Sequence, residues 1–226
     1  AVINNAAATT ETDTQEHTHS LRDAPVTEKE VTITADSDTK VYDGTALTKN
    51  SYTNSALGAG DAIESVTVTG SQTIVGTSNN VPSAAVIKNA ANEDVTASYD
   101  ITYVNGTLEV TKKTVTITAA SDEKVYDGTP LTNNGYTHTA LAAGDVVYSV
   151  NVEGSQTVVG SSDNVPSEAV IKNAANEDVT ASYEITYANG TLEVTEKEVT
   201  ITADRDTTVF AGTALTNTGY THTALA

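Results

Sequence analysis

The sequence predicts an all-β protein made of tandem, immunoglobulin-like 84-residue β-sandwich repeats, arranged end to end as a rod. Three observations predict this architecture. The stretch KVYDGTALT at Lys40–Thr48 returns as KVYDGTPLT at Lys124–Thr132, and a degraded form, TVFAGTALT, follows at Thr208–Thr216. Within each repeat, apolar residues alternate with threonine, which is the period of a half-buried strand. Turn residues separate the short strands, and long helical patterns are absent from the sequence.

The period divides the chain into four parts. Residues 28–111 align with residues 112–195 without a gap, with 63 identities in 84 positions. We call these segments the first unit and the second unit. Residues 196–226 match the N-terminal part of a third repeat, and residues 1–27 are read as the C-terminal remnant or diverged end of a repeat. An 84-residue unit with several short strands has typical immunoglobulin-like dimensions.

Four alternating segments of the first unit are predicted strands, and AVIKNA, which begins at Ala85, is read as a further one. The four segments are Val31–Ala35, Ser65–Thr69, Tyr99–Tyr103 and Thr107–Thr111. Asn105-Gly106 predicts a hairpin between the last two of them. The other turns are predicted at Gly58–Asp61, Asn79–Pro82 and Asn92–Asp94.

The junction between the two units carries no flexible linker. Thr107–Thr111 runs through Lys112 and Lys113 directly into the next alternating segment at Val115, with no run of Gly, Ser or Pro. Because such runs are what makes a linker flexible or extended, we expect little freedom of movement between neighbouring units.

Composition excludes several classes of function. The chain has no Cys, so it can form neither disulfides nor thiolate metal sites, and its net charge of −19 would repel nucleic acids and anionic membranes. No apolar run is long enough to span a bilayer. The sequence holds no recurring Ser/His/Asp constellation and no phosphate-binding loop. We therefore expect a protein that is not an enzyme, with no catalytic residues and no cofactor.

Three motifs in a fixed order resemble the MBG/YDG-type repeats of large bacterial surface proteins. They are KVYDGTPLT, GSQTVVGSSDNVPS and SYEITYANGTLEVT. The Tyr-Asp-Gly of that family's name stands at Tyr42-Asp43-Gly44 and at Tyr126-Asp127-Gly128. The resemblance covers both units and the partial third repeat. It implies immunoglobulin-like stalk or adhesive modules of secreted or wall-attached proteins, and hence an extracellular location.

We interpret the Tyr-Asp-Gly motif as a turn rather than as a chemical site. Asp43-Gly44 would form the tight turn, and the Tyr42 ring would pack near the edge of the sandwich. The third repeat reads Phe210-Ala211-Gly212, which loses the phenol and the carboxylate but keeps Gly212. A catalytic or metal-binding role would need the carboxylate.

Two further candidate sites follow from acidic and recurring side chains. Asp36, Asp38 and Asp43 are calcium candidates, because calcium favours several oxygen ligands from acidic loops. Lys113 and Asn189 recur near the first and last strands of the units and are candidates for a Lys–Asn crosslink of the kind found in Gram-positive surface proteins.

The sequence favours a structural function: an extracellular stalk or fibre segment that projects or assembles an adhesive structure. The alternative is a multivalent adhesin module whose repeats bind host glycans or mucin. The expected partners are neighbouring repeats or copies of the same chain. Two interpretations of the incomplete end repeats stay open: an excerpt of a longer array, or completion by a strand from another molecule.

Overall fold

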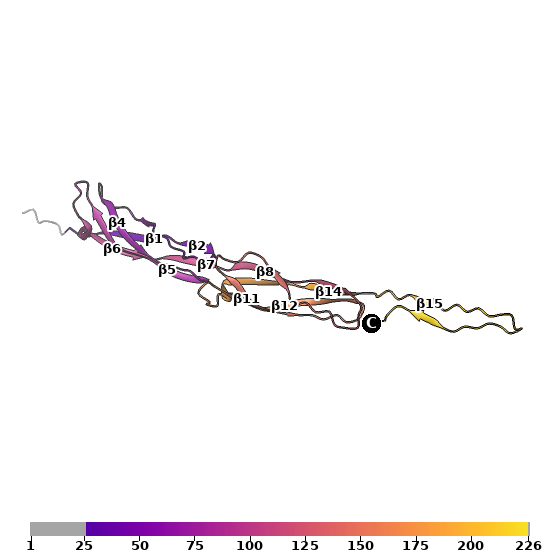
Figure 1. The fold of residues 1–226 in the computed structure, drawn as a ribbon. Coiled ribbons are helices and arrows are strands. Elements are labelled where there is room, and N and C mark those ends of the chain that lie inside the picture. The colour runs from indigo at the N-terminus through magenta and orange to yellow at the C-terminus, as the bar shows by residue number, and fades with distance from the viewer. Residues whose placement is uncertain (1–25, 226) are drawn as a thin grey trace, which may run out of the picture.

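The computed structural model describes residues 26–225, and within them it is all-β apart from two single-turn 3-10 helices (Figure 1). The elements of the first unit are β1 (Lys29–Ala35), β2 (Asp38–Val41), β3 (Tyr52–Asn54), β4 (Ala62–Thr69), β5 (Gly76–Lys88), η1 (Thr96–Ser98), β6 (Tyr99–Val104) and β7 (Gly106–Thr111). Those of the second unit are β8 (Lys113–Ala119), β9 (Asp122–Val125), β10 (Tyr136–His138), β11 (Val146–Glu153), β12 (Gly160–Lys172), η2 (Thr180–Ser182), β13 (Tyr183–Ala188) and β14 (Gly190–Thr195). Two strands follow, β15 (Ile201–Ala203) and β16 (Tyr220–His222). The remnant predicted over residues 1–27 lies almost entirely outside the described residues.

The strands predicted from alternation are confirmed, because β1, β4, β5, β6 and β7 cover them. Strand pairing in the second unit equals that of the first with 84 added to each residue number. Ile33 pairs with Asn54 in the first unit, for example, and Ile117 pairs with His138 in the second. The β15–β16 pair has the same register, since Ile201 lies opposite His222. The equal registers follow from the near-identity of the two sequences.

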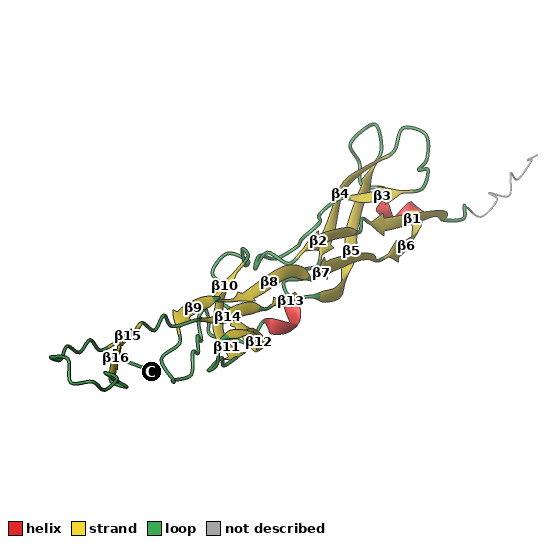
Figure 2. Cartoon of the chain, turned by 90° about the vertical axis from the view of Figure 1, so that its right-hand side faces the viewer, coloured by secondary structure: helices red, strands yellow, loops and turns green. Residues whose placement is uncertain are grey.

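Each unit contains a three-stranded sheet and a four-stranded sheet, and both mix parallel and antiparallel pairs (Figure 2). In the first unit the orders are β3-β1-β6 and β2-β7-β5-β4. The pairs β1–β6 and β2–β7 are parallel, and the remaining pairs are antiparallel. Immunoglobulin sandwiches consist of antiparallel sheets, so these units share their all-β character and size but differ in connectivity.

The hairpin predicted at Asn105-Gly106 is wrong. β6 pairs with β1, while β7 pairs with β2 and β5, so the two strands run on as one bent strand from one sheet into the other. Gly106 allows two segments of backbone to approach each other closely, and it does not form a turn. A Cβ atom at this position would collide with the carbonyl oxygens of Ala35 and Asp36.

The turn predicted at Asn79–Pro82 is also wrong, because these residues lie inside the long strand β5. The first five residues of β5 pair with β7, and the section from Val81 onward pairs with β4. Asn80 is the last residue of the β7 pairing and lies opposite Gly106. It is fully buried (0 % exposed).

The buried amide of Asn80 lies where the strands pass from one sheet to the other, and it fixes the backbone there. Its Nδ2 donates to the carbonyl oxygens of Asp36, between β1 and β2, at 2.9 Å and of Lys49, before β3, at 2.8 Å. Asn164 makes the equivalent bonds in the second unit, at 2.9 and 2.7 Å. A Cβ at Gly70 would lie 2.8 Å from the Asn80 Oδ1, so only glycine fits beside the amide. One side chain therefore joins three separate segments of backbone.

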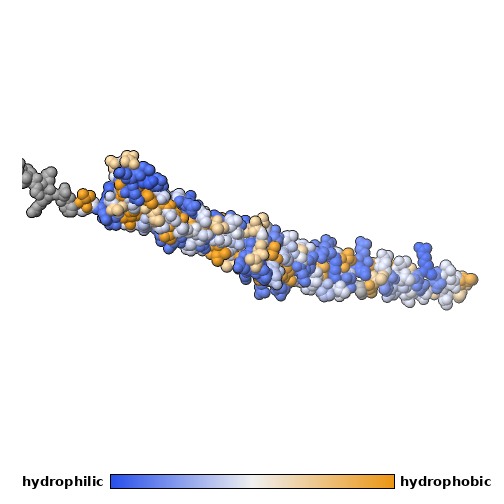
Figure 3. All heavy atoms as spheres, turned by 60° about the vertical axis from the view of Figure 1, so that its left-hand side comes forward, coloured by the Kyte–Doolittle hydropathy of each residue, from blue (hydrophilic) through white to orange (hydrophobic). Residues whose placement is uncertain are grey.

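Buried side chains form three apolar clusters rather than one core. The first unit contains Val31, Ile87 and Tyr99, and the second contains Leu131, Leu192 and Val194. The third and largest cluster draws on both units. Hydrophilic residues cover most of the face drawn in Figure 3, with small hydrophobic patches scattered among them. Within residues 26–225, no helix is long and apolar enough to cross a membrane.

We predict that Asn80→Ala lowers the free energy of unfolding of its unit by about 2–4 kcal/mol, because two partly buried carbonyl groups lose their donor. Asn79→Ala is the matched control: it removes an exposed amide from the same strand and should change stability by less than about 0.5 kcal/mol. Urea unfolding followed by circular dichroism measures both. Equal midpoints for the two variants would contradict the role assigned to Asn80.

Candidate inter-unit interface

The Tyr-Asp-Gly motif forms a turn directly after β2, as the sequence predicts. The Asp43 Oδ1 accepts hydrogen bonds from the Thr45 backbone N–H at 2.9 Å, the Thr45 hydroxyl at 2.7 Å and the Lys40 ammonium at 2.7 Å. Lys40 and the Thr45 donors hold the pKa of the Asp43 carboxyl well below its usual range. The turn after β9 repeats these contacts with Asp127, Thr129 and Lys124.

Glycine is required at the third position of the motif by backbone geometry. Gly44, Gly128 and Gly212 have φ angles of +82°, +79° and +75°, in the left-handed region that side chains with a Cβ rarely adopt. The third repeat therefore keeps the one residue that the turn needs, although Phe210 stands where the other copies have tyrosine.

Tyr42 packs against the following unit, a partner that its own sequence neighbourhood does not indicate. Its ring centroid lies 5.5 Å from that of Tyr183, with the ring planes at 79°, an edge-to-face arrangement. Only 3 % of Tyr42 is exposed. Gly44 is close to the second unit as well, since a Cβ on it would lie 3.3 Å from the Ala143 carbonyl oxygen.

The second unit receives Tyr42 in a site that we call the socket, formed by Ala142, Asp145, Val179 and Tyr183. The Tyr183 hydroxyl donates to the Asp145 Oδ2 at 2.7 Å and accepts from the Ala142 N–H at 2.9 Å. Burial, and then the Asp145 carboxylate, raise the pKa of Tyr42 to about 12, and the same two causes raise the pKa of Tyr183. Both phenols, which are neutral near pH 7 even at the ordinary tyrosine pKa of about 10, therefore stay neutral to a higher pH beside this carboxylate.

Each unit contributes one half of the large apolar cluster, and Tyr42 joins the two halves. The first unit contributes Tyr42, Leu47, Leu108 and Val110, and the second contributes Val115, Ala142, Ile171, Val179 and Tyr183. The first half corresponds, residue by residue, to the cluster of Leu131, Leu192, Val194 and Tyr126. The second half corresponds to the cluster of Val31, Ile87, Tyr99 and Val95. The junction thus unites two clusters that otherwise stand apart.

Equivalent positions differ in burial according to whether a neighbouring unit covers them. Tyr126 is half-buried, whereas Tyr42 is buried. Ser182 is 3 % exposed at the junction, whereas Ser98, the same position of the first unit, is exposed. Because both members of each pair are the same residue type in the same local fold, the difference is the contribution of the neighbouring unit.

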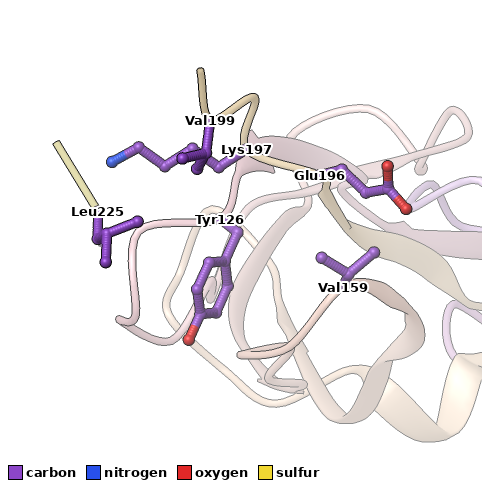
Figure 4. Close-up of a pocket in the computed structure, with 6 residues that line it drawn as sticks. All are labelled: Tyr126, Val159, Glu196, Lys197, Val199 and Leu225. Carbon is purple, nitrogen blue, oxygen red and sulfur yellow. The ribbon is translucent and has the colours of Figure 1, made fainter. Parts of the chain in front are cut away.

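Tyr126 lines a pocket with residues of the second unit and of the partial third repeat (Figure 4). The lining residues are Tyr126, Val159, Glu196, Lys197, Val199 and Leu225. Val199 and Leu225 are the counterparts of Val115 and Leu141 in the complete junction. The lining of this pocket therefore resembles part of the first junction.

The calcium candidates do not form a site. Asp36 accepts a hydrogen bond from the Ser51 hydroxyl, Asp38 lies 3.8 Å from the Lys49 ammonium, and Asp43 belongs to its own turn. Across the described part of the chain, no three His, Cys, Asp or Glu side chains gather as a metal site would require. Each carboxylate serves local structure, so the hypothesis of a calcium site at these residues is wrong.

The proposed crosslink between Lys113 and Asn189 is also wrong. Lys113 lies opposite Tyr183 at one end of the β8–β13 pair, and Asn189 follows Ala188, which lies opposite Thr118 at the other end. The length of strand between the two positions separates them by about 20 Å, beyond the reach of a lysine side chain. The Asn189 amide instead donates to the Asp163 carboxylate at 3.1 Å.

No protein-family model matches this chain, and no curated protein matches it. The resemblance to MBG/YDG-type repeats therefore stays a prediction from the three motifs. Sequence reasoning singled out the Tyr-Asp-Gly turn but missed the socket. Asp61 and Tyr99 recur unchanged in the second unit as Asp145 and Tyr183. This recurrence of a carboxylate and a phenol was the available signal.

We predict that Tyr42→Ala lowers the free energy of unfolding by about 2–4 kcal/mol, because it removes a large buried ring from a packed cluster. Tyr126→Ala is the matched control in the second unit and should cost less than half as much, since that ring is only half-buried. Chemical denaturation of the two variants measures the difference. Equal costs would show that Tyr42 gains nothing from the second unit.

Alkaline pH should weaken the junction through Tyr42. The pKa in the folded protein, about 12, exceeds the value of about 10 for a free phenol. The stabilisation from this neutral phenol is therefore complete below pH ~10 and is lost as the pH rises through about 12. In an ultraviolet titration, Tyr42→Phe should remove one of the ten tyrosines from the fraction that ionises last. An unchanged late fraction would contradict the burial of this phenol at the junction.

Proposed function

We propose that this chain is a segment of an extracellular stalk or fibre of a bacterial surface protein. In this proposal, 84-residue β-sandwich units of immunoglobulin-like size, at residues 28–111 and 112–195, follow one another end to end as a rod. The rod holds an adhesive part of the protein away from the cell or assembles it. The observation that carries the proposal is the apolar cluster that continues from the first unit into the second through Tyr42.

A rod needs junctions that resist bending, and two attachments side by side provide this. β2 and β7 are parallel, and Val41 lies opposite Thr111 at their ends. The chain continues from Thr111 through the single residue Lys112 into β8, while Tyr42 leaves the end of β2 and packs on Tyr183. One attachment is covalent and the other is a buried aromatic contact. A bend at Lys112 would have to separate the rings.

A stalk must also resist being pulled along its length, and the strand order suits this task. The first two strands of a unit pair in parallel with its last two, β1 with β6 and β2 with β7. A pull at the two ends of the unit moves these strands past each other. All of their hydrogen bonds then carry the load together, instead of opening one after another. The high net negative charge and the hydrophilic surface favour a chain that stays extended and soluble.

The alternative, a multivalent adhesin module, would need exposed aromatic rings at recurring positions. Tyr148 is 62 % exposed with the Lys172 ammonium 3.8 Å from its ring centre, but Glu64 stands at the same position of the first unit. Tyr103 and Tyr187 do recur and are 37 % and 40 % exposed, but the hydroxyl of each accepts a hydrogen bond from a β5 or β12 backbone N–H, which holds the ring against its own unit. These recurring rings thus serve strand packing, which favours the stalk.

The stalk proposal is tested by the distribution of distances between the units. The chain has no Cys, so Glu109→Cys and Glu193→Cys, at exposed equivalent positions, place one spin label on each unit. We expect a single narrow distance distribution for the otherwise unchanged chain and a clearly broader one when Tyr42→Ala is added. A broad distribution in both proteins would reject a rigid stalk. Micromolar binding of the unlabelled chain on a glycan array would instead favour the adhesin alternative.

A further inference from the structure

The first unit carries a second socket, and among the described residues no Tyr-Asp-Gly turn lies on it. It consists of Gly58, Asp61, Val95 and Tyr99, the counterparts of the four socket residues of the second unit. Tyr99 donates to the Asp61 carboxylate at 2.6 Å and accepts from the Gly58 N–H at 2.8 Å. The same two hydrogen bonds measure 2.7 and 2.9 Å in the occupied socket. The socket is therefore formed before any partner binds, which lowers the free-energy cost of binding.

The opposite end of the second unit carries the matching turn at Tyr126, Asp127 and Gly128. Its hydrogen bonds agree with those of the first turn to within 0.1 Å, so it too is formed in advance. Its apolar surroundings are less covered than at the junction: Val159 is 49 % exposed, whereas its counterpart Val75 is partly buried. Within the described residues, the second unit thus presents a preformed turn and the first unit presents a preformed socket.

We propose that the socket of the first unit binds the Tyr126-Asp127-Gly128 turn of a second copy of this chain, giving head-to-tail association. The occupant is identified by the junction within the chain, where the equivalent positions already form this contact. The cluster at the Tyr126 end and the cluster at the Tyr99 end are the two halves of the cluster at the junction. Different surfaces meet in such a contact, so it does not close on itself and can continue into a filament. This inference deepens the stalk proposal, on which it rests, by naming the partner of this turn and this socket.

The partial third repeat is a weak competitor for the Tyr126 turn. Residues 198–225 are all exposed, and β15 and β16 pair over only three residues. Large apolar side chains in this segment stay uncovered, with Ile201 68 % and Phe210 93 % exposed. Little apolar area therefore holds the segment on the second unit. The socket of another molecule offers Tyr126 an aromatic ring and a carboxylate, Tyr99 and Asp61, as Tyr183 and Asp145 are offered to Tyr42 at the junction.

Association between separate molecules will be weaker than the contact within the chain. The covalent connection at Lys112 holds the partners of the junction at an effective concentration in the millimolar range, and this advantage is lost between molecules. The net charge of −19 also repels like copies, and added salt screens this repulsion. We therefore expect association at high protein concentration that becomes stronger as the salt concentration rises.

The test is sedimentation of the full chain over a range of concentrations in roughly 0.5 M NaCl, where charges more than a few ångströms apart are screened. The unchanged chain should form oligomers that grow with concentration. Tyr126→Ala removes the inserted ring, and Ser98→Arg places a long side chain at a position that is exposed in the first unit and buried at the occupied socket. Each should raise the dissociation constant at least tenfold. Thr69→Arg, at an exposed position in the middle of the unit, should leave it unchanged.

Mixing the two variants gives the decisive result. The Ser98→Arg chain keeps its turn and the Tyr126→Ala chain keeps its socket, so the mixture should form one-to-one dimers that do not grow further. A chain that stays monomeric at all concentrations, or an association that neither variant weakens, would overturn the proposal. Either result leaves the stalk intact, because the distance distribution between units is measured within one molecule.

Discussion

The amide of Asn80 is the contact from which the shape of each unit follows. Three segments of backbone change direction or sheet at its level: the passage from β1 to β2, the passage from β6 to β7, and the approach to β3. A buried amide with two donated hydrogen bonds holds their separation, and Gly70 and Gly106 let the backbones come close enough. With these segments held in place, β2 and β7 end side by side, and the Tyr-Asp-Gly turn that follows β2 projects out of the unit. Asn164 does the same in the second unit.

The junction between the units combines a rigid turn with a preformed acceptor. The Asp43 carboxylate is occupied by Thr45 and Lys40, so it shapes the turn and does not compete for the Tyr42 phenol. On the other side, Asp145 holds Tyr183 by a short hydrogen bond to its hydroxyl. Two rigid surfaces lose little conformational freedom when they meet, so most of the gain from burying the aromatic ring remains available to hold the units together.

This arrangement also explains how nearly identical repeats can have different surroundings. The turn of the first unit and the socket of the second unit cover each other, whereas the turn of the second unit and the socket of the first unit are more exposed. Tyr42 and Tyr126, or Ser182 and Ser98, differ in burial because of their neighbours and not because of their own sequence. Stability in such an array is a sum of unit and interface contributions, as in other repeat proteins. The tyrosine contributes to the interface, and the buried asparagine contributes to the unit.

The sequence by itself determined the 84-residue period, the all-β class, the positions of strands such as Val31–Ala35 and Thr107–Thr111, and the turn that contains Asp43 and Gly44. These features are local, because alternation and left-handed glycines act on the backbone that carries them. Only the tertiary structure decided that Asn80 and Gly106 lie where strands pass between the two sheets, and not in turns. Both residue types favour tight turns, yet they also suit places where backbones meet closely, and the sequence does not distinguish the two uses. The tertiary structure likewise decided the partner of Tyr42, because Tyr183 belongs to the last part of the following unit. Alternation in a sequence shows which face of a strand is buried, but it does not show what covers that face.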